Sequence, residues 1–221
     1  MKKILKIVLI IVLFLIALFC IAVLRKVIII KGIQKTAANY LNSTNYHIES
    51  IAKEDNGTKV TINYYQKNDK QAMVMERNLN NQLSTIRMYN NNNQIDMFYD
   101  TPEEKTAHLN TASPMVIGLY DYFECENLFQ TITACIPARI QKIKYDGKTC
   151  YVVDNFMSQT MLHGTDVDKV YVDKETGLCI KTNLNGIITD RKYEFDNVDD
   201  SVFIEPDIKQ YKVEEVDNRS N

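Results

Sequence analysis

The chain has 221 residues and a formal net charge of −2, with 45% hydrophobic and 24% charged residues. This length allows one domain or two small ones and excludes a large multidomain assembly. Charge is uneven, because seven of the 26 basic residues lie in the first 35 positions and the first acidic residue is Glu49. The remainder carries 19 basic against 28 acidic side chains, a formal charge of −9. Such an acidic body is repelled by phosphate backbones, so we expect no nucleic-acid partner.

An unbroken apolar run extends from Ile7 to Leu24. A helix of this length spans roughly 27 Å at about 1.5 Å per residue, close to the thickness of a bilayer's hydrocarbon core. We expect residues 1–31 to form an uncleaved membrane anchor, with residues 7–24 in the bilayer. One alternative is a cleaved signal, for which the best site, Cys20-Ile21-Ala22, is weak. The other alternative is a lipoprotein signal ending at Cys20. Such a signal has a small residue before the cysteine, whereas this chain has the bulky Phe19.

Basic residues flank this run on both sides, so the positive-inside count is nearly balanced. Because a short tail precedes the run and a long acidic domain follows it, we predict a single-pass protein of the cell membrane with a cytoplasmic N-terminus. Residues 32–212 would form an extracytoplasmic domain and residues 213–221 a polar tail. The basic cluster after the run would then hold anionic lipid at the outer headgroups. This cluster consists of Arg25, Lys26, Lys31 and Lys35.

Helical spacing continues beyond the membrane run, at Ile30, Ile33, Ala37 and Leu41, which predicts an amphipathic helix that docks on the body. A series of antiparallel strands follows, predicted by β-branched and aromatic runs between Asn- and Asp-rich turns. These strands are expected at Tyr46–Ala52, Thr58–Gln66, Ala72–Arg77, Leu83–Tyr89 and Gln94–Tyr99.

The middle of the chain has a different period. Apolar residues between Pro114 and Cys135 recur every three or four positions, which predicts one or two helices starting from caps at Thr111 or Ser113. A second strand series is expected at Arg139–Tyr145, Thr149–Phe156, Val167–Asp173, Leu178–Asn185 and Ile187–Phe195. With about ten strands interrupted by helices, the fold class is α+β.

The C-terminal strands contain a recognisable sequence pattern. It consists of Val170–Leu178, Gly186, Tyr193–Val198, Phe203 and Pro206. This pattern resembles the closing strands of the lipoprotein-carrier (LolA-like) superfamily over about the last 40 residues. The resemblance implies a curved, incomplete antiparallel β-barrel whose covering helices enclose an apolar side that binds acyl chains. The membrane anchor departs from the soluble carriers of that superfamily.

Catalytic and metal-binding patterns are not found in the sequence. The three histidines, His47, His108 and His163, have no partner at ligand spacing, and there is neither a Gly-x-Ser-x-Gly elbow nor a glycine-rich phosphate loop. We expect no catalytic residue, no metal and no cofactor. The body holds four cysteines whose spacing indicates no pairing, which favours unpaired thiols over any given disulfide. These cysteines are Cys125, Cys135, Cys150 and Cys179.

Methionines stand in the first strand series, where β-propensity favours Val or Ile. Flexible thioethers suit a cavity that accepts chains of varying shape, although they also fill irregular cores. The resemblance assigns these strands to an acyl-binding face and so favours the first reading. The expected apolar ligand site comprises Met73, Met75, Ile86, Met88, Met97, Leu119 and Phe123.

The function expected from the sequence is a non-enzymatic, membrane-tethered, extracytoplasmic binding module. Its partner would be a lipid or an acylated protein, whose chain is taken between the sheet and the helices near Pro114–Ile136. The alternative is an envelope sensor or interaction module with a self-filled groove, whose acidic surface contacts another envelope protein.

Overall fold

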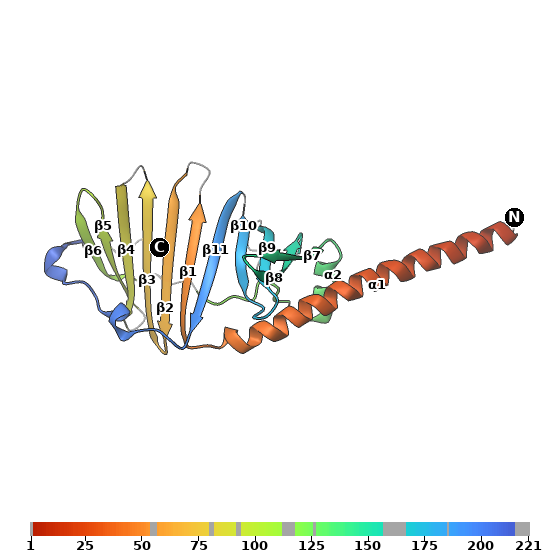
Figure 1. Ribbon diagram of the computed structural model, residues 1–221, viewed down its shortest axis with the longest axis horizontal. Coiled ribbons are helices and arrows are strands. Elements are labelled where there is room, and N and C mark those ends of the chain that lie inside the picture. The colour runs from red at the N-terminus through yellow and green to blue at the C-terminus, as the bar shows by residue number, and fades with distance from the viewer. Residues whose placement is uncertain are drawn as a thin grey trace. The chain divides into compact units, whose positions relative to one another are not determined.

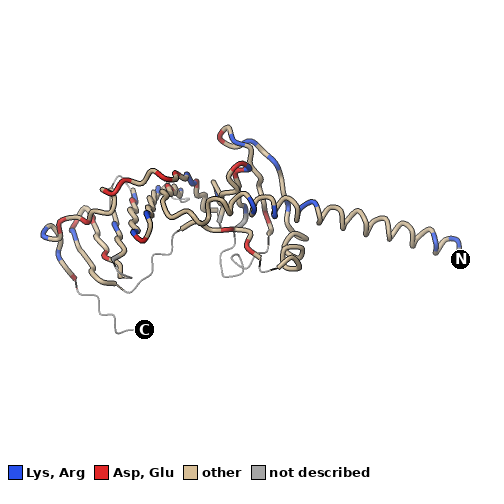
Figure 2. Tube along the Cα trace, turned by 90° about the horizontal axis from the view of Figure 1, so that it is seen from below, with Lys and Arg blue, Asp and Glu red and all other residues tan. Residues whose placement is uncertain are grey.

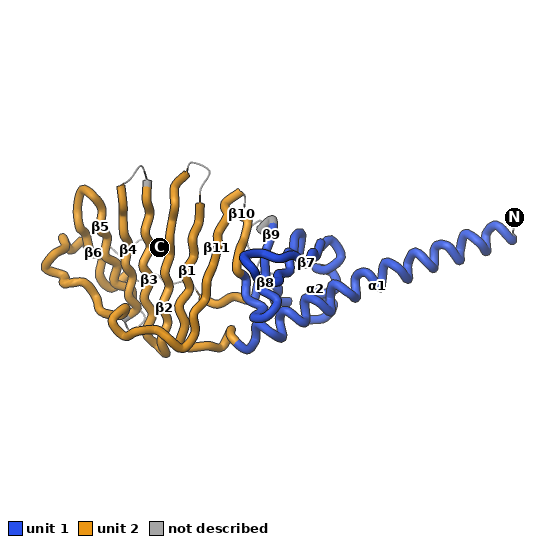
Figure 3. The backbone as a smooth tube through the Cα atoms, viewed as in Figure 1, with its two compact units in different colours: residues 1–39, 121–179 blue, residues 40–120, 180–221 orange. Residues whose placement is uncertain are grey.

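A computed structural model describes residues 2–53, 57–79, 82–91, 94–111, 118–125, 127–156, 167–184 and 186–214. The described chain is α+β, with a long apolar N-terminal helix and mostly antiparallel strands (Figure 1). It divides into two compact units (Figure 3). Unit 1 comprises residues 1–39 and 121–179, and unit 2 comprises residues 40–120 and 180–221.

Helix α1 (Lys2–Leu41) is unbroken and is long and apolar enough to cross a membrane. Its apolar stretch lies between basic positions at its start and further along the helix (Figure 2). The expected boundary between residues 31 and 32 falls inside this helix. A buried stripe also begins before that boundary, at helical spacing. The stripe consists of Val23, Val27, Ile30, Ile33 and Ala37.

Unit 1 packs this stripe with α2 (Leu128–Cys135) and an antiparallel sheet. The strands of that sheet are β7 (Arg139–Tyr145), β8 (Lys148–Asp154) and β9 (Val167–Asp173). The side chains at the centre of the core are at most 1% exposed. They include Ile30, Cys135, Val153, Val170 and Val172. This is a sealed helix-on-sheet core.

A glycine turn lets α1 approach the sheet of unit 1. Gly177 has φ +72°, and its N–H donates to the Asp173 carbonyl at 2.8 Å. A Cβ atom at Gly177 would lie 2.6 Å from the Ala37 nitrogen and 2.6 Å from the Ile33 carbonyl oxygen. Both the positive φ and the close backbone therefore require glycine here.

Unit 2 is built on one open sheet, in which β12 pairs with β6 in parallel and the described neighbours otherwise pair antiparallel. Within the described residues no pairing closes its two ends on each other. In spatial order the strands are β12 (Lys212–Glu214), β6 (Lys105–Thr111), β5 (Gln94–Asp100), β4 (Gln82–Asn91), β3 (Lys70–Leu79), β2 (Lys59–Lys67), β1 (Asn45–Lys53), β11 (Ile187–Phe195) and β10 (Cys179–Leu184). Two short 3₁₀ turns, η1 (Asp200–Phe203) and η2 (Ile208–Gln210), precede β12.

The two predicted strand series are confirmed, each strand within two residues at either end. Strands β6 and β12 were not expected. The first has no clear apolar alternation in its sequence, and the second has only three residues. Thr111, expected as a helix cap, instead ends β6.

Of the one or two helices predicted over Pro114–Cys135, α2 (Leu128–Cys135) is confirmed, but the prediction is wrong for residues 118–125, which are not helical. Residues 112–117, with Ser113 and Pro114, lie outside the described residues. The Asp121 carboxylate accepts the Phe123 N–H at 2.9 Å, and the Gln34 amide donates to the Phe123 carbonyl at 2.7 Å. These bonds replace helical ones, so the helix starts only after Asn127, whose side chain accepts the Gln130 N–H.

Candidate functional site

Residues that are all apolar except Ser50 occupy two neighbouring rows on one face of the unit 2 sheet. Successive members of each row are direct partners on adjacent strands. The first row runs Ile48, Tyr64, Met73, Met88, Met97. The second row runs Ser50, Ile62, Met75, Ile86, Tyr99. We call the central part of these rows, residues Ile62, Met73, Met75, Ile86, Met88 and Met97, the methionine face.

Burial varies across the methionine face. Met73 is 5% exposed and belongs to a core cluster with Tyr46, Ile48 and Tyr64. The other members of the face are half-buried. Because these half-buried side chains are neighbours, they leave a continuous apolar surface that is partly accessible.

Neutral polar groups border one end of this face. The hydroxyls of Tyr46 and Tyr64 donate to the Gln66 Oε1 atom at 2.8 and 3.0 Å. Burial raises the pKa of both phenols above the ordinary value, so they remain uncharged at neutral pH. Next to them the Asn90 amide donates to Gln71 at 3.0 Å. This edge offers hydrogen bonds without charge.

The structure brings together six of the seven residues expected from sequence. Met73, Met75, Ile86, Met88 and Met97 share the face, and Leu119 packs against its core cluster. Phe123 instead lies in the core of unit 1, where it is 2% exposed and contacts Phe156 edge-on at 5.2 Å between ring centroids.

Four residues at the site were not selected from sequence: Tyr46, Ile48, Ile62 and Tyr64. They alternate with residues of the opposite face along β1 and β2; the register pairs Ile62 and Tyr64 with Met75 and Met73, and Tyr46 and Ile48 join Tyr64 and Met73 in one core cluster. Alternation in the sequence was a usable signal for these residues, but the pairing of β2 with β3 was needed to link them to the methionines.

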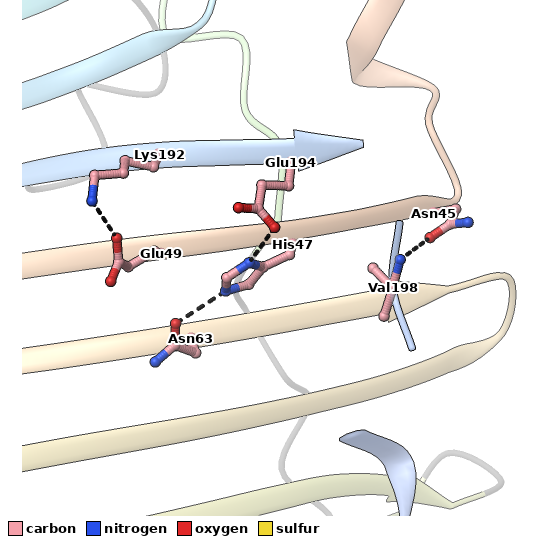
Figure 4. A network of polar contacts seen from close by, with 7 residues as sticks. All are labelled: Asn45, His47, Glu49, Asn63, Lys192, Glu194 and Val198. Atoms are coloured by element: carbon pink, nitrogen blue, oxygen red, sulfur yellow. Dashed lines mark hydrogen bonds and ion pairs between the residues drawn. The ribbon is translucent and has the colours of Figure 1, made fainter. Parts of the chain in front are cut away.

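The opposite face of β1, β2 and β11 is polar (Figure 4). Lys192 pairs with Glu49 at 2.9 Å, and the His47 Nε2 atom lies 3.0 Å from the Asn63 Oδ1 atom. His47 also lies 3.5 Å from Glu194 and stacks on Tyr65. The opposite face is thus suited to water over β1, β2 and β11, whereas over β3–β6 it carries a buried apolar cluster of Ala72, Tyr89, Phe98 and Ala107.

A second polar cluster holds Asp100 on β5. Burial raises the pKa of Asp100, but hydrogen bonds from Arg87 and Tyr211 and the charges of Arg87 and Lys105 outweigh it, so its pKa lies below the ordinary value. Its carboxylate therefore stabilises the fold only while it is ionised.

Cys125, Cys135 and Cys150 carry free thiols, of which Cys125 is half-buried and the other two are buried; Cys179 is also buried. Burial raises the pKa of Cys135 to about 11 and also raises the pKa values of Cys125 and Cys150. These groups are therefore poor nucleophiles at neutral pH.

The described histidines do not form a cluster. His108 contacts Glu214 at 3.3 Å, as His47 contacts Glu194, while His163 lies outside the described residues. Within the part of the chain that the structure describes, no three His, Cys, Asp or Glu side chains gather as metal ligands.

No protein-family model matches the chain, and no curated protein matches it in sequence. Among solved structures, the chain is similar to an uncharacterized conserved protein from Thermus thermophilus. The TM-score is 0.44 at 9% identity, over 84% of this chain and 98% of that one.

Proposed function

We propose that the protein is a membrane-tethered, extracytoplasmic, non-enzymatic binding module. It takes one acyl chain, from a lipid or from a lipoprotein, onto the methionine face. The observation that carries this function is the direct pairing of Met73, Met88 and Met97 across β3, β4 and β5, of which Met88 and Met97 are half-buried.

The physical driving force is burial of apolar surface, worth about 25 cal/mol per Å² or about 0.8 kcal/mol per buried methylene. An acyl chain lying across the strands would cover Met75, Met88 and Met97 and complete their burial. Thioether side chains adopt many rotamers, so the face accommodates chains that differ in length and unsaturation.

The chain connectivity supports a ligand that comes from the membrane. Unit 2 begins at Tyr40, within the last turn of α1, and α1 carries the apolar run suited to a bilayer. A module on such a tether stays near lipid and does not need to shuttle between membranes. In this proposal the open sheet is an incomplete barrel of the LolA-like kind, with its apolar side as the binding side.

One observation favours the alternative, a sensor or interaction module with a self-filled groove. Ile48, Tyr64 and Met73 are already buried, so part of the face is covered without any ligand. The two functions differ in whether an acyl chain reaches the remaining half-buried positions.

Photo-crosslinking of the full chain separates them. The protein is reconstituted in nanodiscs containing a phospholipid with a diazirine near the end of its acyl chain, irradiated and mapped by peptide mass spectrometry. Crosslinks within residues 7–24 provide the internal reference. An acyl-binding module gives additional crosslinks in β3, β4 and β5.

Matched variants test the site. Met75→Asn combined with Met88→Asn places polar groups on the methionine face, and we expect the crosslinks in β3–β5 to fall several-fold relative to the reference. Val74→Asn, a half-buried residue on the opposite face of β3, serves as the control and should leave them unchanged. Labelling confined to residues 7–24 in the unmodified protein would favour the interaction module.

A further inference from the structure

A groove of about 780 Å³ runs beside α1 in unit 1, where the apolar run of the helix ends. Its helical wall is a stripe of Ile21, Leu24 and Ile28, which are 62%, 54% and 71% exposed, together with Arg25. Ligand sites commonly enclose about 300–1,000 Å³, so this volume suits part of a lipid molecule.

The other wall comes from the sheet of unit 1. Lys142 on β7 and its direct partner Tyr151 on β8 line it. Lys142 and Arg25 are exposed, and within the described residues neither forms an ion pair with an acidic side chain. The groove therefore combines an apolar strip with two cations that are open to an anion.

A third cation at the groove has a different role. The Lys26 Nζ atom donates to the carbonyl oxygens of Cys135 and Ile136, at 3.1 Å each. Lys26 thereby holds the C-terminal end of α2 against α1. The exposed apolar residues of α2, Leu128 at 59% and Phe129 at 74%, belong to the same unit.

The position of the groove on α1 indicates which kind of molecule binds in it. Apolar side chains exposed on a helix that is suited to a bilayer are stabilised by lipid, and cations at the end of such a helix meet the phosphate groups of headgroups. Ile21 and Leu24 belong to the apolar run, and Arg25 follows directly. The acyl chains of an anionic phospholipid match the apolar strip of this groove, and its charged headgroup matches the two cations.

The geometry points to a site for one anionic glycerophospholipid in this groove. Arg25 and Lys142 contact the headgroup phosphate, and the acyl chains lie along Ile21, Leu24 and Ile28. This site is in unit 1 and is independent of the function proposed for unit 2.

The test is native mass spectrometry of the full chain released from nanodiscs that contain equal amounts of phosphatidylglycerol and phosphatidylcholine. We expect the unmodified protein to retain one phosphatidylglycerol in preference to phosphatidylcholine. In Arg25→Gln combined with Lys142→Gln, that preference should fall by roughly fivefold for each charge removed.

The matched control is Arg139→Gln combined with Lys144→Gln. These residues lie exposed on the same strand as Lys142 but do not line the groove. The control removes the same charge and should retain the preference. Equal retention of both lipids by the unmodified protein, or equal losses in the two variant pairs, would overturn the site.

Ile28→Ser tests the apolar wall without disturbing the core, because Ile28 is 71% exposed. It should reduce the retention of both lipids while leaving the preference for phosphatidylglycerol. Retention unchanged in this variant would contradict the proposed placement of the acyl chains.

Discussion

The core of unit 1 and the methionine face of unit 2 treat apolar side chains in opposite ways. In unit 1, Ile30, Val153, Val170 and Val172 are at most 1% exposed and belong to one sealed core. In unit 2, Met75, Met88 and Met97 are half-buried on an open sheet. Complete burial gives stability, whereas incomplete burial leaves surface that a second molecule can cover. We therefore expect truncations in the core of unit 1 to cost more stability than truncations on the methionine face, where an acyl chain would bind.

The largest contrast should come from truncating one side chain in each unit. Ile30→Ala removes a fully buried side chain and should cost about 2–5 kcal/mol, whereas Met75→Ala removes a half-buried one and should cost about 1 kcal/mol. Urea unfolding of the full chain in detergent measures both, followed by the fluorescence of its 13 tyrosines, since it has no tryptophan. Equal costs would remove the distinction between the two units.

Two turn glycines of unit 1 test how closely α1 packs on the sheet. At Gly177 an added Cβ meets the backbone of α1 as well as a positive φ, so Gly177→Ala should destabilise the protein by about 2–4 kcal/mol. Gly147 has φ +75° but open space around it, so Gly147→Ala should cost only about 1 kcal/mol. The same unfolding measurement compares them, and similar values would mean that α1 is not held closely at this turn.

Thiol reactivity reports how tightly the core of unit 1 is sealed. Cys135 is fully buried with a raised pKa of about 11, while Cys125 is half-buried. At pH 8 we expect iodoacetamide to alkylate Cys125 at least about tenfold faster than Cys135. Peptide mass spectrometry over a time course gives the two rates. Matching rates would indicate that the core opens on the timescale of labelling.

The smallest effect concerns the polar cluster of unit 2. Its lowered pKa means that Asp100 contributes stability above the ordinary carboxyl value of 3.8 and loses it as the pH falls through the folded-state value. Asp100→Asn should therefore cost about 1–2 kcal/mol at pH 7, and the difference should shrink below about pH 4.

Thermal unfolding in detergent at both pH values measures this dependence. The control is Glu103→Gln, which removes a carboxylate outside this cluster, on the exposed loop between β5 and β6. It should change the unfolding temperature little at either pH. A pH-independent loss in the Asp100 variant would assign its effect to packing.

Periodicity in the sequence predicted most elements of the fold. The apolar run and the spacing of Ile30, Ile33 and Ala37 indicated one long helix with a docking stripe, which α1 has. Alternation located the strands that carry the four methionines and placed Met73 and Met75 on one face. These signals are local, since a strand period of two and a helix period near 3.6 are visible in short windows.

The failures involve contacts between residues distant in sequence. Residues 118–125 have helical spacing, yet Gln34 bonds to Asp121 and to the Phe123 carbonyl across more than 80 positions. From the sequence, Phe123 is expected in the ligand site, whereas it lies in the core of unit 1. The spacing of apolar residues does not show which of two cores a side chain enters. Nothing local indicates that the chain from Asp121 returns to α1 to build a separate unit.

The continuity of α1 has a mechanical consequence. The same helix carries the membrane run and the buried stripe from Val23 to Ala37, with no break between them. Since each residue turns a helix by about 100°, one residue inserted directly before Val23 would rotate the apolar residues that precede it relative to the buried stripe and unit 1 by that angle. The rotational position of unit 1 about the axis of α1 is therefore fixed by the phase of a single helix, so a rotation of the apolar run would be transmitted directly to unit 1.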